Sequence, residues 1–344
     1  MHAKNSPMPR LSICIATLNR VEFIGETLDS IIGQMNDDTE LVIVDGASTD
    51  GTDRVVRQKF AGRGNCHYHR LEQKGGIDQD YDLAVTLASG EFVWLMTDDD
   101  IVHEGAIKLL LSCLGEDVDL TLLNVEVASP DLKVTLVRQK MKIEADTRFT
   151  GDELPRVMES CGDLLSFIGC VVIRRSEWMT RDRCKYYGTE FVHVGVIFQR
   201  AFSRGILAIA SPKIRIRYGN AMWFERGAMI WLFKWPGLVW SFDDLPERSR
   251  RAVVSRHPWE HLPVLLAMKA RGWLSTASYN RLFRGLKSGW VVRAKMWTVC
   301  YLPDVVFNFV ACLLCGLVFR RERGIHVDLR KSPFYFRKYL SRMR

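Results

Sequence analysis

Phe92-Val93-Trp94-Leu95-Met96-Thr97-Asp98-Asp99-Asp100 is an apolar run of strand length that ends in three adjacent carboxylates. Two earlier apolar runs also end in polar clusters: Leu11–Ala16 precedes Thr17-Leu18-Asn19-Arg20, and Leu41–Val44 precedes Asp45-Gly46-Ala47-Ser48. Helix-period segments lie between the runs, and strands that alternate with helices predict a mostly parallel sheet in an α/β domain. Ligands of such sheets bind beyond the carboxyl ends of the strands, where these polar clusters fall.

The apolar pattern predicts the elements that surround these clusters. Expected strands are Leu11–Ala16, Leu41–Val44, Cys66–Leu71, Phe92–Met96, Leu120–Val127, Phe167–Arg174 and Ile206–Ala210. Expected helices are Val21–Met35, Asp53–Phe60, Asp78–Ala88, Glu104–Leu114 and Phe191–Phe202.

Charge is distributed unevenly along the 344 residues. Residues 1–199 carry 21 Lys and Arg against 32 Asp and Glu, a net charge of −11, whereas residues 200–344 carry 27 against 8, a net charge of +19. Eight of the ten Trp also lie beyond residue 200. Lys and Arg mixed with Trp suit lipid headgroups, so the second half predicts contact with an anionic membrane surface. Nucleic acid is the competing anion, but no nucleic-acid-binding motif is present, which argues against that partner.

One segment of the second half bears on how the protein meets a membrane. Val305–Phe319 has Asn308 as its one polar side chain and is bounded by Asp304 and Arg320. A spanning helix needs about 20 apolar residues, so the segment is consistent with an interfacial helix, a buried core helix or a span. The first ten residues lack the apolar stretch of a signal peptide, and we therefore expect a cytoplasmic protein.

The three carboxylates after the fourth run indicate a cation site. Adjacent like charges raise the free energy unless a cation is present. Mg²⁺ and Mn²⁺ prefer hard oxygen ligands and share phosphate oxygens with nucleotide substrates, so Asp98, Asp99 and Asp100 fit either ion. An acidic turn or helix N-cap is the alternative. Asp45 could accept hydrogen bonds from a nucleobase edge, whereas Ser48, Thr49 and Asp50 are explained as an N-cap of the next helix.

Four stretches in this order resemble the inverting family-2 glycosyltransferases with the GT-A fold: Ile13–Arg20, Val44–Thr52, Ala88–Phe92 and Trp94–Asp100. The resemblance covers residues 10–125 well and 160–220 loosely. It implies transfer of a sugar, with inversion, from a nucleotide-diphosphate sugar to an acceptor hydroxyl, with Mn²⁺ or Mg²⁺ as cofactor.

The resemblance also implies roles for individual residues. Thr17 and Arg20 line the nucleotide pocket, with Asn19 in the same donor-binding cluster. Asp45 contacts the base, and Asp98 holds the ribose. Asp99 or Asp100 ligates the metal.

Two further segments look like the branch that adds deoxyhexoses to lipid-linked O-antigen or capsule units, such as the abequosyltransferases. One is Gly75–Tyr81, where Asp78 could touch ribose or donor sugar, although an acidic helix N-terminus explains it equally well. The other is Phe191–Gly195. The family's catalytic base is a carboxylate in the region that corresponds to Tyr187–His193. Glu190 is the nearest carboxylate and His193 lies about where the family has an acidic pair, so both are candidate bases.

Alternating basic residues mark Lys213–Arg217. A loop in this region of similar enzymes closes over the diphosphate. Arg215 and Arg217 could therefore pair with phosphate oxygens, and an exposed edge strand is the alternative.

We therefore expect a GT-A domain over residues 1–220, with a donor half of about 10–125 and an acceptor half of about 126–220. A basic, Trp-rich helical region over 221–344 would associate with the inner face of the cell membrane. The expected acceptor is a lipid-linked glycan of bacterial surface polysaccharide. A nucleotidyltransferase on a similar fold is the alternative enzyme, and a basic nucleic-acid-binding protein is the alternative outside enzymes.

Overall fold

Four parallel strands form the first half of the central sheet. The computed structural model describes residues 8–318 and 323–335, and its strands follow the order β3-β2-β1-β4-β9-β6-β10-β5, with β8 paired to β10. In chain order the strands are β1 (Leu11–Thr17), β2 (Thr39–Asp45), β3 (Cys66–Arg70), β4 (Phe92–Met96), β5 (Ile101–Val102), β6 (Val118–Ala128), β7 (Thr135–Val137), β8 (Thr147–Phe149), β9 (Val171–Arg174) and β10 (Gly205–Arg217). The pairs β1–β2, β2–β3 and β1–β4 are parallel, whereas β9 is antiparallel to both β4 and β6.

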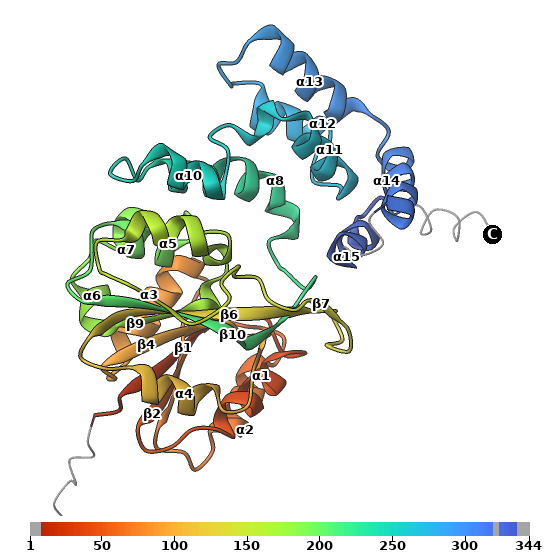
Figure 1. Ribbon diagram of the computed structural model, residues 1–344. Helices are drawn as coiled ribbons and strands as arrows, with labels where there is room; N and C mark the ends of the chain where they lie inside the picture. The colour runs from red at the N-terminus through yellow and green to blue at the C-terminus, as the bar shows by residue number, and fades with distance from the viewer. Residues whose placement is uncertain (1–7, 319–322, 336–344) are drawn as a thin grey trace, which may run out of the picture. The chain divides into compact units, whose positions relative to one another are not determined.

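Helices cover both faces of this sheet. The helices α1, α2 and α4 lie on one face, and α3, α5 and α7 lie on the other (Figure 1). Their bounds are α1 (Ile24–Ile32), α2 (Thr52–Phe60), α3 (Ile77–Leu87), α4 (Ala106–Cys113), α5 (Leu154–Cys161), α6 (Arg175–Met179), α7 (Val192–Phe198) and α10 (Glu247–Val253). Every residue of β1, β2 and β4 is buried, which is why these strands read as continuous apolar runs rather than as alternating ones.

The elements expected in the first 125 residues are all present, with ends that shift by a few residues. Three later expectations need correction, the first being the helix expected over Phe191–Phe202, which ends at Phe198 as α7. Of the segment expected as a strand over 167–174, only Val171–Arg174 is extended, because residues 168–170 form a short 3-10 turn. The strand expected over 206–210 continues to Arg217 as β10, since its second half pairs with β5.

The chain forms two compact units. The first contains residues up to 127, then 138–217 and 242–253; the second contains 128–137, 218–241 and the residues from 254 onward. The second unit is mostly helical and includes α8 (Gly227–Met229), α9 (Trp235–Trp240), α11 (Leu262–Ala270), α12 (Thr276–Ser278), α13 (Trp290–Tyr301), α14 (Asp304–Val318) and α15 (Arg323–Lys331).

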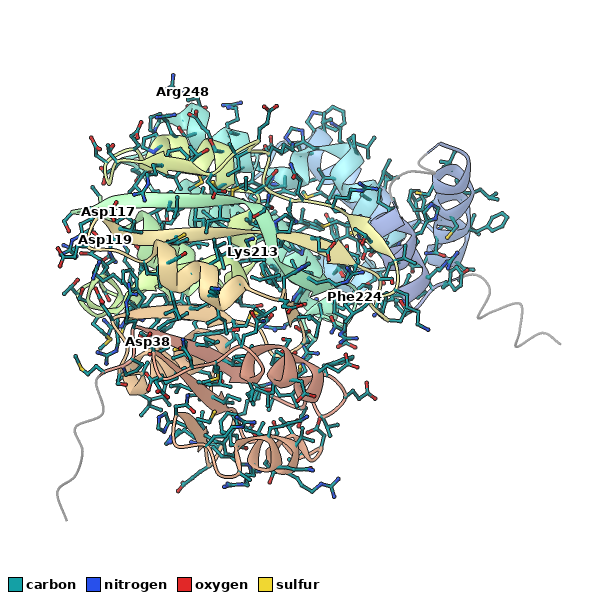
Figure 2. The ribbon with its side chains drawn as sticks, turned by 60° about the horizontal axis from the view of Figure 1, so that its bottom comes forward. Asp38, Asp117, Asp119, Lys213, Phe224 and Arg248 are labelled. Carbon is teal, nitrogen blue, oxygen red and sulfur yellow. The ribbon has the colours of Figure 1, made fainter. Side chains whose placement is uncertain are left out.

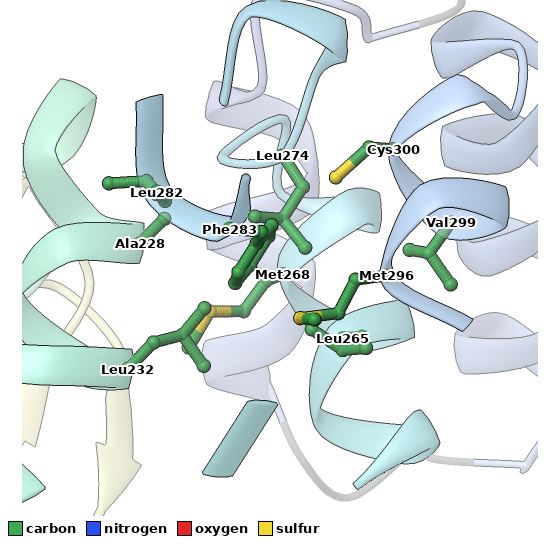
Figure 3. Close-up of a cluster of buried hydrophobic side chains, with 10 residues drawn as sticks. All are labelled: Ala228, Leu232, Leu265, Met268, Leu274, Leu282, Phe283, Met296, Val299 and Cys300. Atoms are coloured by element: carbon green, nitrogen blue, oxygen red, sulfur yellow. The ribbon is translucent and has the colours of Figure 1, made fainter. Parts of the chain in front are cut away.

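The second unit has a hydrophobic core of its own (Figure 3). Its buried members are Ala228, Leu232, Leu265, Met268, Leu274, Leu282, Phe283, Met296, Val299 and Cys300. The core is built mainly from α11, α13 and the segment between them. The apolar segment that begins at Val305 lies within α14, whereas Phe319 and Arg320 fall outside the described residues.

Candidate active site

The strand order places a site at the ends of β1 and β4. The chain adds β2 and β3 on one side of β1 and then returns to place β4 on the other side. Connections leave β1 and β4 toward opposite faces at such a reversal, which opens a crevice beyond their carboxyl ends. Thr17 ends β1, and the acidic residues Asp98, Asp99 and Asp100 follow β4.

Arg20 joins the two strand ends. Its guanidinium Nε lies 3.2 Å from Asp98 Oδ1, and its Nη2 lies 3.3 Å from Asp99 Oδ2. These side chains are largely buried, with 12 to 13% of each exposed. Three residues that the sequence assigned to the donor and metal sites are thus in direct contact, and two carboxylates converge on one cationic group.

Asp100 and Arg217 form the next layer of the same cluster. The Asp100 carboxylate accepts a hydrogen bond from the Thr97 hydroxyl at 2.5 Å and another from the backbone N–H of Arg217 at 2.7 Å. The Arg217 guanidinium donates to the backbone carbonyl of Asp99 at 3.1 Å and also pairs with Glu26. Asp100 is 2% exposed, so its contacts hold β10 against the acidic turn.

The carboxylates of this turn carry raised pKa values. Burial and the neighbouring Asp99 raise the pKa of Asp98 to about 7, against the opposing effects of Arg20 and the Thr17 hydroxyl. Burial raises the pKa of Asp100 to about 6, although its hydrogen bonds oppose this shift. Because burial disfavours the charged form of these carboxylates, an added cation would be stabilised there.

This donor set fits a divalent cation shared with a substrate. The described residues contain no group of three or more His, Cys, Asp or Glu able to hold a metal alone. Mg²⁺ and Mn²⁺ in nucleotide sites need only one or two carboxylates, because phosphate oxygens and water complete the shell. Asp98 and Asp99 already converge on the Arg20 guanidinium, so two carboxylates meet at one point of the acidic turn.

Asp45 lies at the end of β2, as expected, but its oxygens bond inside the protein. Oδ1 accepts the backbone N–H of Ser48 at 2.7 Å, and Oδ2 accepts the Tyr68 hydroxyl at 2.6 Å. The residue is 0% exposed. In this structure Asp45 shapes the loop after β2, and a contact with a nucleobase stays a prediction.

Asn19 ties the loop after β1 to the loop after β2. It has a left-handed backbone with φ of 53°, its N–H donates to the Ser48 hydroxyl at 2.8 Å, and its side-chain oxygen accepts the N–H of Thr49 at 2.8 Å. Asn tolerates this backbone region better than most residues. The exposed Asn19 thus links the loop after β1 to the loop after β2. The expected N-cap of α2 also differs, since the cap is Gly51, and Asp50 instead bonds to Val21 and Thr52.

Asp78 organises the loop that carries Glu190. Its carboxylate accepts three backbone N–H groups, from Gly188 at 2.8 Å, Glu190 at 2.9 Å and Val192 at 3.0 Å. Asp78 is 2% exposed, so the structure gives it a scaffolding role in place of the expected contact with ribose or sugar. Glu190 has a left-handed backbone with φ of 71°, an uncommon conformation for a residue with a side chain, and it is only half-buried.

Asp80 is a candidate that the sequence reasoning passed over. It is 7% exposed. A Cβ on Gly46 would lie 3.2 Å from Asp80 Oδ2, which places this carboxylate beside the loop after β2. Burial, with the charge of Asp45, raises the pKa of Asp80 to about 6. Two residues along a helix turn the side chain by roughly 200°, so Asp78 and Asp80 face different loops.

The structure favours Glu190 over His193 as a base. His193 is 1% exposed, its Nε2 lies 2.8 Å from the backbone oxygen of Leu165, and its buried Nδ1 has no hydrogen-bonding partner among the residues that the structure describes. Burial lowers the pKa of His193 to about 4, so the ring is neutral and closed off from solvent. His193 was expected as a candidate base that would meet the acceptor. In the structure it is instead a core residue of α7.

Arg215 is also engaged elsewhere. Its guanidinium lies 2.5 Å from the Glu126 carboxylate, which is itself within 3.2 Å of the His103 ring. Of the two arginines expected to meet phosphate, Arg217 therefore joins the acidic cluster and Arg215 pairs with β6. Glu126 and Glu26 gave no local sequence signal, because their arginine partners lie 89 and 191 residues away.

The sequence of the first half of the chain matches a known protein family. Residues 12–178 match the model of a family described as glycosyl transferase family 2. This chain carries a family-2 glycosyltransferase domain. The match includes β1, β2 and β4 with the loops that hold Thr17, Asp45 and Asp98, which confirms the family that the four sequence stretches resemble.

Two curated relatives of this chain are glycosyltransferases by their names. Abequosyltransferase RfbV of Salmonella typhimurium is 26% identical over 234 residues, which cover 63% of this chain and 69% of the relative. A GalNAc(5)-diNAcBac-PP-undecaprenol beta-1,3-glucosyltransferase of Campylobacter jejuni is 31% identical over 110 residues, 32% of this chain and 36% of the relative. The chain thus spans about two thirds of the first relative and about a third of the second.

Solved glycosyltransferase structures share the fold. TarS residues 1–349 of S. aureus in complex with UDP superpose with a TM-score of 0.56 at 17% identity, covering 96% of this chain and 91% of that one. A mannosyltransferase, PcManGT of Pyrobaculum calidifontis, in complex with GDP-Man and Mn²⁺, gives a TM-score of 0.52 at 15% identity over 95% of this chain and 87% of that one. These likenesses confirm the expected α/β GT-A fold with a helical C-terminal region.

Proposed function

We propose that this chain transfers a sugar, of the deoxyhexose class, from a nucleotide-diphosphate sugar to a hydroxyl of a lipid-linked glycan, with inversion. The observation that carries the proposal is the convergence of Asp98 and Asp99 on one cationic group at the strand-order reversal. The names of the abequosyltransferase and of the undecaprenol-linked glucosyltransferase support the donor and acceptor classes. The product expected is a surface polysaccharide unit such as O-antigen.

In this proposal each part of the cluster has a role at the donor diphosphate. A bound Mg²⁺ or Mn²⁺ supplies positive charge to the leaving diphosphate. Asp99 holds that ion, and Asp98 orients the ribose. Arg20 and Arg217, which contact the acidic turn, pair with phosphate oxygens in this proposal.

Glu190 is the base in the proposed transfer. The acceptor oxygen forms a bond to the anomeric carbon as the bond from that carbon to the diphosphate oxygen breaks, and Glu190 accepts the hydroxyl proton. Attack from the face opposite the leaving group inverts the anomeric centre. Asp78 fixes the position of Glu190 through its bonds to the backbone of the 188–192 loop.

The test is a thermal-shift measurement with UDP, GDP, CDP and dTDP, each with and without Mn²⁺. A ligand that binds only the folded state stabilises it by roughly 2.7 kcal/mol at a hundredfold excess over its dissociation constant. We expect one nucleotide to raise the melting temperature in a Mn²⁺-dependent way, and Asp99→Asn to abolish that dependence without loss of fold.

Asp117→Asn is the matched control for Asp99→Asn. Asp117, labelled in Figure 2, lies just before β6 and forms an exposed pair with Arg148. Because β6 runs in the same direction as β4, its start lies at the end of the sheet opposite the acidic turn that follows β4. It should keep the full shift. A normal Mn²⁺-dependent shift in Asp99→Asn would show that the metal site is misplaced. Release of pyrophosphate instead of a nucleoside diphosphate during turnover would favour the nucleotidyltransferase alternative.

A further inference from the structure

The helices α13 and α14 expose an unusual amount of apolar surface. On α14 the exposed side chains, with their exposed fractions, are Val306 (60%), Phe309 (40%), Val310 (43%), Leu313 (50%) and Leu314 (52%). Their spacing of three and four residues places them along one stripe of the helix. Soluble proteins rarely expose a continuous apolar stripe of this kind without a partner.

The opposite face of α14 is attached to the second unit. Asn308 is 0% exposed, and its side-chain amide donates to the backbone oxygens of Ala270 at 3.0 Å and Leu329 at 3.1 Å. Cys315 packs in a small core with Ala270 and Leu329. The one polar side chain inside the apolar segment therefore points into the protein, and the apolar stripe points away from it.

The junction between α13 and α14 is sharply bent, and the charge of Asp304 at this junction is neutralised by an ion pair. The Asp304 carboxylate lies 2.6 Å from the ammonium of Lys269, which is 1% exposed and also donates to the backbone oxygens of Leu274 and Cys300. Among the described residues no single helix is long and apolar enough to cross a membrane. The pair α13 and α14 meets the length and composition together, with a bend of 93°.

The neighbouring helix α13 exposes aromatic side chains of its own. Trp290 is 76% exposed, and Trp297, 50% exposed, stacks on Tyr301 with ring centroids 4.6 Å apart. These two are the Trp residues beyond position 200 with strongly exposed rings, whereas Trp223, Trp231 and Trp273 pack against one another.

The surrounding sequence is positive throughout. Residues 261–303 contain seven Lys and Arg and no Asp or Glu. Five of the seven are exposed, namely Arg281, Arg284, Lys287, Arg293 and Lys295. A second copy of this chain would bring like charges together, and nucleic acid would leave the apolar stripe exposed to water. Anionic lipid headgroups over acyl chains match both features.

We propose that the exposed stripe of α14 and the aromatic edge of α13 insert into one leaflet of an anionic bilayer, with the adjoining cations on its headgroups. The helices then lie in the interface and do not span it, since the other face of α14 is held by Asn308. This membrane contact would give the enzyme access to a lipid-linked acceptor. The inference therefore rests on the proposed function and extends it.

The test is co-sedimentation of the full chain with vesicles of phosphatidylcholine, with or without phosphatidylglycerol. We expect binding that requires phosphatidylglycerol, and Leu313→Ser with Leu314→Ser to weaken it roughly tenfold or more, since both side chains leave the apolar layer. Lys295→Gln with Arg293→Gln should weaken binding and reduce its salt dependence. Val134→Ser with Val137→Ser removes equally exposed apolar side chains elsewhere in the second unit and should leave binding unchanged.

The nucleotide-dependent thermal shift is measured on the same variants, so that the two proposals can fail separately. An unchanged shift with weakened vesicle binding supports the membrane surface. Binding to vesicles with no nucleotide shift would leave the surface supported and the transferase proposal without its donor site. Equal vesicle binding by Leu313→Ser with Leu314→Ser and the parent would overturn the proposal, as would lipid-free dimerisation that these substitutions abolish.

Discussion

The Asp78 carboxylate bonds to three backbone N–H groups of the loop that carries Glu190, and Asp78→Asn leaves it one oxygen to accept them. We expect a fall in kcat with little change in the donor KM, because the proposed base Glu190 loses its position while the proposed donor pocket keeps its residues. Loss of buried hydrogen bonds should also cost about 1–3 kcal/mol of folding stability. Transfer kinetics and urea unfolding measure both effects. A raised donor KM at normal kcat would instead return Asp78 to the role of a donor ligand.

The buried His193 should make the free energy of unfolding depend on pH. The folded pKa of about 4 lies below the unfolded value of 6.5, so the unfolded chain binds more protons between these pH values. Stability from the neutral ring is therefore complete above about pH 6.5 and is lost as the pH falls toward 4. From pH 7 to pH 5 we expect a loss on the order of 2 kcal/mol at this site.

His193→Gln isolates that contribution, because the glutamine amide can still donate to the Leu165 oxygen but does not titrate. Urea unfolding at pH 7 and pH 5 should show a smaller acid loss in the variant than in the parent. An identical pH dependence in both proteins would mean that the ring is not held neutral in the folded state.

The hydrogen bonds that attach α14 to the second unit should contribute to the stability of that unit. Asn308→Leu keeps the size of the side chain but leaves the carbonyls of Ala270 and Leu329 without their donor. We expect the second unit to lose about 1–3 kcal/mol of stability, measured by chemical unfolding. Val306→Ala on the exposed face of α14 should change it by a few tenths at most. Similar effects from both substitutions would argue against the orientation of the helix.

The elements also show what local pattern can predict. The strands β1, β2 and β4 were predicted closely, because a strand buried on both faces is a continuous apolar run. The strand β10 was predicted only in its first part, since its second half mixes Arg215 and Arg217 with apolar residues. Arg215 pairs with Glu126, and Arg217 contacts the acidic turn. A local sequence pattern cannot predict partners that are so distant in the chain.

At the scale of the whole molecule, each of the two units has its own buried core. The residues of the proposed nucleotide site lie in the first unit, so a nucleotide with Mn²⁺ should stabilise that unit through mass action and leave the second unaffected. We expect differential scanning calorimetry to resolve two transitions, of which one moves to higher temperature with the ligand. One transition that moves as a whole would show that the units unfold together.

The sequence by itself determined the parallel half of the sheet and the strand ends where Thr17, Asp45 and Asp98 lie. Apolar runs mark buried strands, and the rule that ligands bind beyond their carboxyl ends depends only on the order of elements. Only the tertiary structure decided which polar side chains face the site. The Asp78 carboxylate accepts hydrogen bonds from residues more than a hundred positions away, and His193 is buried in the core. Arg20 forms ion pairs with both Asp98 and Asp99. Hydrogen bonds and burial depend on such distant neighbours, which is why local sequence pattern could not predict them.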